Sequence, residues 1–290
     1  MINVTKTFLP PQEEYNVILK HAWDTNWITN RGVLVQELEG KLKNYLGVPH
    51  LIATTNGTLP PLSYVATTSS IVWEGCTPVF VDIHPEYLTI DETKIEAAIT
   101  PNTSAILATH VFGNPCNMEA IEVISKKYKL KVIYDAAHCF GVTYKGKSIF
   151  KYGDISTCSF HATKVFHTGE GGALFCNSKA LHNTLFYHHN FGHEGPEKFQ
   201  GLGINAKMSE LQAAMGLSVL PYIDSIIEER KKIVAFYNSR LINLQTLKLR
   251  SETKWNCSYY PVIFNDELQL LKVQKALNDS EIYPRRYFYP

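Results

Sequence analysis

The stretch GDISTCSFHATKVFHTGEGGALFC, residues 153–176, places a lysine between two short apolar segments. Lys164 is flanked by small and hydroxylated residues, and Gly169, Gly171 and Gly172 follow it. Such a loop can bring backbone and hydroxyl groups close to an anionic ligand. A lysine amine can also be a covalent catalyst, because it condenses with an aldehyde to give a Schiff base. The stretch therefore makes Lys164 a candidate for covalent catalysis, and a solvated loop lysine is the alternative.

A candidate partner for this lysine lies upstream, in KVIYDAAHCFG (residues 131–141), an apolar run that predicts a strand reaching Asp135. Enzymes that use pyridoxal phosphate need a carboxylate that keeps the ring nitrogen protonated, so that the ring can accept electrons. An aspartate at a strand end is otherwise often a helix N-cap. The order and spacing of Asp135, Ser159 and Lys164 indicate this chemistry more strongly than any of them does alone.

Composition and charge limit the class of protein. The chain has 290 residues, 45% of them hydrophobic, and a net charge of +1. It is long enough for a buried core, and its charge favours neither a nucleic-acid nor a membrane surface. No apolar run reaches the ~18 residues of a membrane span, and the N-terminus lacks a signal-peptide core. The six cysteines form no CxxC pair, so we expect buried free thiols in a cytoplasmic protein, and no histidine spacing indicates a metal site.

The order of apolar segments predicts an α/β fold. Helix, linker and helix are expected over residues 10–46. Strands are predicted at 50–55, 77–83, 104–111 and 131–137, and helices at 63–75, 91–99 and 118–129. This alternation indicates a mostly parallel sheet sandwiched by helices, in which ligands lie at the carboxyl ends of strands. Asn56, His110 and Asp135 are expected at or near such ends.

The second half of the chain predicts a smaller unit. Short strands are expected at 156–161 and 171–177, and a long helix, broken by Pro221, at 208–241. A strand at 255–264 and a helix at 267–277 follow. We therefore predict a large domain over residues 1–220 and a partial small C-terminal α/β domain over residues 221–290.

A series of motifs falls in the order of one known family. The motifs are WITNRGVLVQELEGKLKNYLGV, TPVFVDI, YDAAHCFG, GDISTCSFHATK, GEGGA, HHNFGH and GINAKMSELQAAMGL. With them the chain resembles the DegT/DnrJ/EryC1/StrS aminotransferases, the nucleotide-sugar transaminases of the type I pyridoxal-phosphate fold. The variants FHATKVFHTGEGGA and INAKMSE look most like the branch that acts on dTDP-linked 4-keto-6-deoxyhexoses. The resemblance implies transfer of an amino group from L-glutamate to a nucleotide-linked keto sugar, for surface polysaccharide or antibiotic sugar biosynthesis.

The resemblance also implies catalytic roles. Lys164 would hold pyridoxal 5′-phosphate covalently and shuttle a proton during transamination. Some sugar dehydratases of the family have a histidine at this position, so a lysine favours transamination. Asp135 would pair with the pyridine nitrogen. His138 would lie near the ring hydroxyl. The alternative is that His138 is a partly buried imidazole whose hydrogen bonds are satisfied within the protein.

Other residues are implied as contacts of the cofactor. Ser159 would hydrogen-bond the phosphate, and Gly57 and Thr58 would offer it backbone amides at a helix N-terminus. Tyr64 would stack on the ring, although an aromatic residue there is more often part of a core. Asn190 would reach the phosphate of the neighbouring subunit, which implies a homodimer whose sites are completed across the interface.

The chain departs from the family pattern in two places. Thr58 is followed by LPPLS and Tyr64, where the family has a whole helix and the start of the next strand. Pro60 and Pro61 lack amide donors, so they disfavour a new helix there. The family also continues beyond the RRYFYP segment at residues 285–290, so the small domain is expected to be incomplete. A minor difference is that Lys207 stands where many relatives have arginine.

These departures leave three hypotheses open. The first is a working transaminase. The second is a deleted relative that keeps the site residues but binds the cofactor weakly or acts only as an interaction partner. The third is a nucleotide-binding oxidoreductase, which is disfavoured because no GxGxxG follows an early strand. A missing helix would expose apolar surface worth several kcal/mol, out of a total stability of ~5–15 kcal/mol. We therefore expect a chain that aggregates readily, dimerises poorly and holds pyridoxal phosphate weakly.

Overall fold

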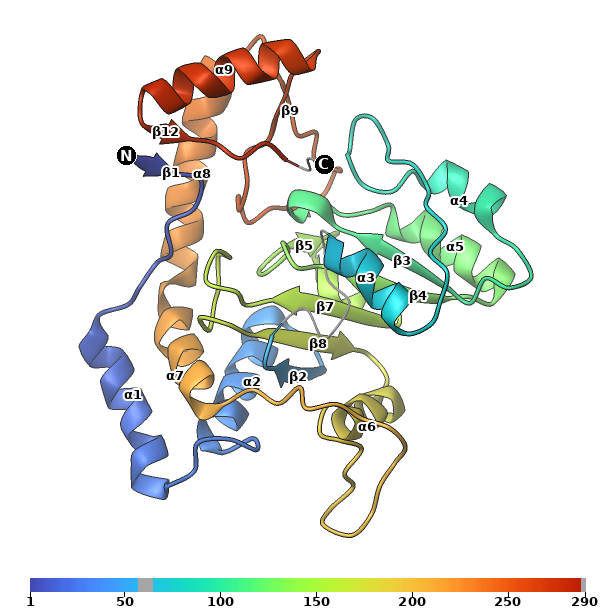
Figure 1. Ribbon diagram of the computed structural model, residues 1–290, viewed down its shortest axis with the longest axis vertical. Coiled ribbons are helices and arrows are strands. Elements are labelled where there is room, and N and C mark those ends of the chain that lie inside the picture. Colours follow the sequence, from blue (N-terminus) through green and yellow to red (C-terminus); the bar gives the residue numbers. More distant parts are fainter. Residues whose placement is uncertain (57–64, 288–290) are drawn as a thin grey trace.

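The computed structural model describes residues 1–56 and 65–287, and a five-stranded mixed sheet forms its centre (Figure 1). The strand order is β2-β8-β7-β4-β3. The strands are β2 His50–Thr54, β8 Gly172–Cys176, β7 Ile155–Ser159, β4 Lys131–Asp135 and β3 Ala105–Thr109. Strands β3, β4 and β7 are parallel, and β8 is antiparallel to both of its neighbours. Since β8 alone runs in the opposite direction, the predicted mostly parallel sheet is confirmed.

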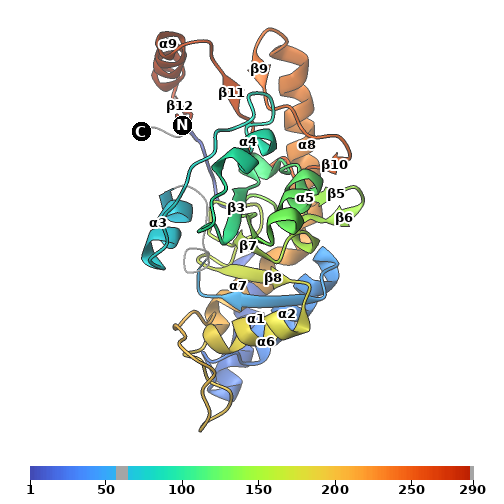
Figure 2. The same ribbon diagram turned by 90° about the vertical axis from the view of Figure 1, so that its right-hand side faces the viewer.

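Helices cover both faces of this sheet, and Figure 2 shows α3 on one side and α5 and α2 on the other. Within the described residues the helices up to residue 219 are α1 Gln12–Thr25, α2 Val33–Leu46, α3 Val65–Trp73, α4 Glu92–Ala98, α5 Met118–Tyr128, α6 Lys179–His188 and α7 Glu210–Val219. Helix α2 buries its apolar stripe, including Leu38 and Leu42, and ends at Gly47, whose φ of 62° suits a residue without a side chain. The predicted α/β sandwich is confirmed, and the first two residues of the helix predicted at 63–75 lie outside the described residues.

A nearly continuous helical rod connects the sheet to the C-terminal part of the chain (Figure 1). Helix α7 passes through the 3₁₀ turn η3 Leu220–Tyr222 into α8 Ile223–Arg240. Pro221 stands at the start of that turn, where a missing backbone N–H is tolerated. The predicted break is therefore no more than one 3₁₀ turn.

The remaining elements are short. They are β1 Ile2–Asn3, β5 Thr143–Tyr144, β6 Lys147–Ser148, β9 Gln245–Thr246, β10 Thr253–Lys254, β11 Val262–Ile263, β12 Ile282–Tyr283, α9 Glu267–Asp279 and the 3₁₀ turns η1 Val111–Gly113 and η2 Ile149–Lys151. Of the strand predicted at 255–264, only β11 forms, paired with β9. Strand β1 pairs with β12, and β10 pairs with β5, so segments far apart in the sequence are joined. The domain boundary at residues 220 and 221 stays a prediction.

One predicted strand is wrong. Residues 77–83 join no sheet, apart from a single bridge between Ile83 and Ile90. Val79 and Phe80 are 64% and 77% exposed. The alternation of β-branched residues predicts a strand, but a strand also needs a partner edge, and the sheet ends at β3. This extended apolar segment is therefore left on the surface.

This exposed segment should promote self-association, because an extended apolar stretch can pair with another chain. We expect Phe80→Lys to reduce light scattering on heating while changing the free energy of unfolding by less than about 0.5 kcal/mol, since the side chain is exposed. Val123→Lys is the control, because Val123 is 67% exposed but belongs to helix α5 and not to an extended segment. Equal scattering from Phe80→Lys and the unmodified chain would show that the segment does not drive association.

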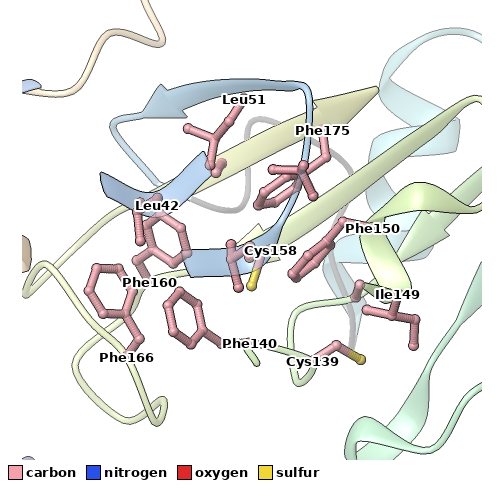
Figure 3. Packing of buried hydrophobic residues seen from close by; sticks show 14 of the residues in the cluster. Leu42, Leu51, Cys139, Phe140, Ile149, Phe150, Cys158, Phe160, Phe166 and Phe175 are labelled. Carbon is pink, nitrogen blue, oxygen red and sulfur yellow. The ribbon is translucent and has the colours of Figure 1, made fainter. Parts of the chain in front are cut away.

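Phenylalanine side chains pack together in the buried core beside the sheet (Figure 3). Phe140 and Phe166 stack with ring centroids 4.4 Å apart, and Phe160 meets Phe166 edge-on at 4.8 Å. Phe150 stacks on Phe175 at 4.0 Å. All five are buried, and each contributes roughly 1.5–3 kcal/mol by burial.

The six cysteines are free thiols and five are buried. None of the described helices has the length and apolar character needed to cross a membrane.

Candidate active site

Two neighbouring parallel strands end in the polar residues of the candidate site. Strand β4 ends at Asp135 and β7 ends at Ser159, with Asp135 paired in register with Thr157. Because the carboxyl ends of parallel strands meet at the same edge of a sheet, both side chains lie at that edge. Lys164 follows Ser159 after four residues, and its amine lies near enough to Asp135 for the two charges to interact.

The loop that carries Lys164 is compact and anchored at both ends. Phe160 N donates to Gly171 O at 2.8 Å, and Thr168 N donates to Phe160 O at 2.9 Å. Phe166 is fully buried in the aromatic core just after the lysine. A Cβ atom at Gly171 would lie 1.9 Å from Thr168 Oγ1, so no larger residue fits there without a rearrangement. The glycines after the lysine therefore close the loop.

The Lys164 amine is half-buried and faces an aromatic side chain. Its Nζ donates to the Tyr259 hydroxyl at 3.1 Å and lies 5.8 Å from the centre of the Tyr259 ring. Burial lowers the pKa of Lys164 below its ordinary value, although nearby thiols and Asp135 oppose the shift. A lowered pKa raises the fraction of neutral amine, which is the form that attacks a carbonyl carbon.

Asp135 is a fully buried carboxylate. Its Oδ1 accepts from Ala137 N at 3.1 Å, and its Oδ2 accepts from Thr67 Oγ1, on α3, at 2.8 Å. Burial raises the pKa of Asp135 to about 7, against these two hydrogen bonds and the charge of Lys164. The nearby positive charge and hydrogen bonds therefore do not compensate for the burial of this carboxylate. A cation placed beside it would stabilise its ionised form.

His138 is a buried neutral imidazole that lines the same pocket as Lys164. Its Nδ1 accepts from Phe112 N at 3.1 Å, so the ring proton lies on Nε2. The ring lies 4.5 Å from that of Tyr259. Burial, assisted by the charge of Lys164, lowers the pKa of His138 well below its ordinary value. The Nδ1 atom thus has a hydrogen-bond partner within the protein, and the Nε2 atom is a hydrogen-bond donor.

His110, also expected at a strand end, is a core residue. It is fully buried, its Nδ1 accepts from Cys116 N at 3.0 Å, and it stacks on Tyr134 at 4.5 Å. Burial lowers its pKa to about 3. His110 is therefore neutral and is not among the residues that line the Lys164 pocket.

The other predicted contacts are placed differently. Ser159 is buried at the strand end, where its Oγ accepts from His161 N at 3.3 Å. Asn190 follows α6 and forms an isolated bridge with Asn205, apart from the residues that line the Lys164 pocket. The structure thus brings Asp135, His138 and Lys164 together and leaves Asn190 outside the group.

Three predicted cofactor contacts, Gly57, Thr58 and Tyr64, lie outside the described residues. Their proposed roles rest on the resemblance alone.

Two residues of the pocket were missed by sequence reasoning. The pocket beside Lys164 is also lined by Tyr259 and by Arg230 of α8. Arg230 Nη1 donates to Ser258 O at 3.1 Å and so ties α8 to the segment that carries Tyr259. Tyr259 lies 95 residues from Lys164 along the chain, inside an apolar stretch that predicts a strand. No local pattern indicates that it approaches the lysine.

Comparisons with known proteins agree on one family. The profile described as the DegT/DnrJ/EryC1/StrS aminotransferase family matches residues 11–60 and 59–290. A dTDP-4-amino-4,6-dideoxy-D-glucose transaminase of Shigella dysenteriae is 40% identical over 100% of this chain and 85% of its own length. A transaminase of the same name from Escherichia coli is 37% identical over 100% of this chain and 84% of its own length. Among solved structures, DesI in the presence of its TDP-sugar product has a TM-score of 0.91 and 30% identity, covering 99% of this chain and 79% of DesI.

The family match is interrupted at one position. It divides into two parts at residues 59 and 60, directly after Thr58. The alignment with the Shigella protein extends over 311 positions, which is more than the 290 residues of this chain. The interruption coincides with the place where the sequence predicts a missing segment.

Proposed function

Because this chain belongs to the DegT/DnrJ/EryC1/StrS aminotransferase family, we propose that it transfers the amino group of L-glutamate to a dTDP-linked 4-keto-6-deoxyhexose. In this reaction L-glutamate becomes 2-oxoglutarate, and the keto carbon of the sugar becomes a primary amine. Family membership makes the chain a sugar aminotransferase and decides against the oxidoreductase hypothesis. The dTDP-linked hexose is inferred from the names of the relatives.

The proposal includes pyridoxal 5′-phosphate as the cofactor, and the observation that carries it is the group of Lys164, Asp135 and His138. Asp135 is a buried carboxylate short of positive charge, which suits a protonated pyridine nitrogen. Lys164 offers a half-buried amine with a lowered pKa. His138 offers a neutral N–H donor. The residues present therefore fit this cofactor, which when bound supplies an aldehyde for amino groups and a ring that accepts electrons.

Each residue then has a defined task. Lys164 Nζ holds the cofactor and, once released, takes up and gives back a proton. The Asp135 carboxylate keeps a proton on the ring nitrogen, because separating the two charges in a buried site is costly. His138 Nε2 would donate to the ring hydroxyl oxygen, and Ser159 Oγ would donate to the phosphate. For Gly57, Thr58 and Tyr64, the family resemblance supports phosphate binding and ring stacking.

We also propose a homodimer in which Asn190 contacts the phosphate of the partner's cofactor. The loop after α6 projects from the molecule (Figure 1). It carries exposed apolar side chains, including Phe199 at 60% and Leu202 at 94%. Exposed apolar clusters of this kind favour burial against another protein. A projecting apolar loop beside Asn190 suits a residue that acts in the neighbouring subunit.

The test of the reaction is a single turnover with each substrate. L-glutamate should convert the bound cofactor to its amine form and release 2-oxoglutarate. dTDP-4-keto-6-deoxyglucose should then restore the aldehyde form, which is followed by absorbance, together with an aminated sugar found by mass spectrometry. A GDP-linked keto sugar is the control and should react more slowly. Protein that holds the cofactor but aminates no keto sugar would refute the proposal.

A further inference from the structure

Tyr259 lines the site but has no task in the reaction described above. Its hydroxyl receives the hydrogen bond from Lys164 Nζ at 3.1 Å. Its ring is held between other aromatic rings, at 4.5 Å from His138 and 5.8 Å from Phe112. A phenol fixed by packing on its ring holds its hydroxyl at a defined point, so the lysine amine meets a preset partner.

The chemistry of the phenol suits an amine that changes its protonation state. Burial raises the pKa of Tyr259 to about 12, against the charges of Arg230 and Arg285, so its hydroxyl stays neutral at physiological pH. A neutral hydroxyl can accept from an ammonium group and can donate to an amine. Tyr259 can therefore hold Lys164 Nζ before and after that atom takes up a proton.

We propose that Tyr259 is a positioning residue that holds the Lys164 amine whenever this amine is not bonded to the cofactor. The proposal rests on the proposed function, in which Lys164 must leave the cofactor and act as a proton carrier. Nζ takes up one proton and later releases it, so neither Lys164 nor Tyr259 is permanently changed. The Tyr259 hydroxyl limits the positions open to the flexible lysine side chain, and such orientation accelerates proton transfer.

The neighbouring tyrosine provides a matched control. Tyr260 also carries a hydroxyl, which donates to Asn238 Oδ1 at 2.8 Å, but Tyr260 is not among the residues that line the Lys164 pocket. Tyr259→Phe and Tyr260→Phe therefore remove the same atom from adjacent positions. Phenylalanine keeps the ring contacts, so both variants should fold, and thermal melting checks that they do.

The first measurement uses the cofactor-free protein and no catalysis. Acylation of Lys164 at a series of pH values, followed by peptide mass mapping, reports the pKa of its amine. Tyr259→Phe should lower that pKa by a further half to one unit, roughly, because the buried ammonium loses an acceptor. Tyr260→Phe should leave it unchanged. The other groups that act on this amine, Asp135, Arg285 and the thiols of Cys139 and Cys158, are the same in all three proteins.

The second measurement uses the protein loaded with cofactor. In Tyr259→Phe, both single-turnover half-reactions should slow about tenfold or more, with the KM for L-glutamate nearly unchanged, because orientation and not binding is lost. Tyr260→Phe should match the unmodified chain.

The two measurements separate this role from the proposed function. If the unmodified chain transaminates but Tyr259→Phe changes neither the Lys164 pKa nor the half-reactions, Tyr259 is only a packing residue and the inference is wrong. If Tyr259→Phe lowers the melting temperature but changes neither the Lys164 pKa nor the half-reactions, Tyr259 is likewise only a packing residue. If the unmodified chain binds cofactor and does not transaminate, the proposed function fails and this role fails with it.

Discussion

Lys164→Ala should abolish transamination and the covalent attachment of pyridoxal phosphate. The Lys164 amine is half-buried at the edge of the sheet, and its lowered pKa favours the neutral nucleophile. Because the same amine is proposed to carry the proton, both tasks are lost at once, and we expect activity to fall by at least about 10³-fold. Borohydride reduction of the unmodified protein with pyridoxal phosphate, followed by peptide mass mapping, should find a pyridoxyl group on Lys164.

Lys151→Ala is the matched control, because this lysine is exposed in η2 and should be dispensable. Lys164→Ala should not lower the melting temperature of the cofactor-free chain, since it removes an amine whose ionisation is disfavoured by burial. A pyridoxyl group on another lysine, with none on Lys164, would contradict the assignment.

Asp135→Asn should reduce transamination by at least about a hundredfold while leaving some cofactor bound. The amide oxygen can still accept from Ala137 N, and the amide nitrogen can donate to Thr67 Oγ1, so the shape of the site is kept. Only the negative charge that would face the pyridine nitrogen is lost, and the ring would then accept electrons less readily. Asp154→Asn is the control, because Asp154 bonds Val132 N at the other end of β4. Unchanged turnover in Asp135→Asn would rule out the role.

The same substitution should stabilise the cofactor-free chain at alkaline pH. The pKa of Asp135 is raised from 3.8 to about 7 in the folded chain, so the folded state binds this proton more tightly than the unfolded state. The associated stability is fully present below about pH 4 and is lost as pH rises towards 7. At about 1.4 kcal/mol per pKa unit, the loss is of the order of 4 kcal/mol.

Thermal melting at two pH values checks this sign. At about pH 8 the cofactor-free Asp135→Asn chain should melt above the unmodified chain, and at about pH 4 the two should melt alike. If the variant melts below the unmodified chain at both pH values, Asp135 stabilises the fold, and the predicted destabilisation by its buried charge is wrong. Asp135 would then destabilise the cofactor-free protein and still be required for turnover. This is expected of an active-site residue, because function and stability compete there.

The fold was largely predictable, because most elements are specified by local patterns. Helix α2 follows from its apolar period and Gly47, and β4 follows from the apolar run before Asp135. The failure at residues 77–83 has a physical cause. A strand is stabilised by hydrogen bonds to a neighbour, and no sheet edge in the described structure pairs with this segment. Its exposed apolar side chains agree with the expectation that the interruption after Thr58 weakens the chain, which stays a prediction.

The sequence by itself determined which chemical groups are present and roughly where the chain places them. Lys164 and Asp135 could be chosen from their residue types, their order and the strand ends beside them, because those features are local. Only the tertiary structure decided their surroundings. Thr67 and Tyr259 come from 68 and 95 residues away to bond Asp135 and Lys164. Burial by such distant segments shifts both pKa values. Desolvation depends on everything packed around a group, so the reactivity of this lysine and this aspartate is a property of the folded chain.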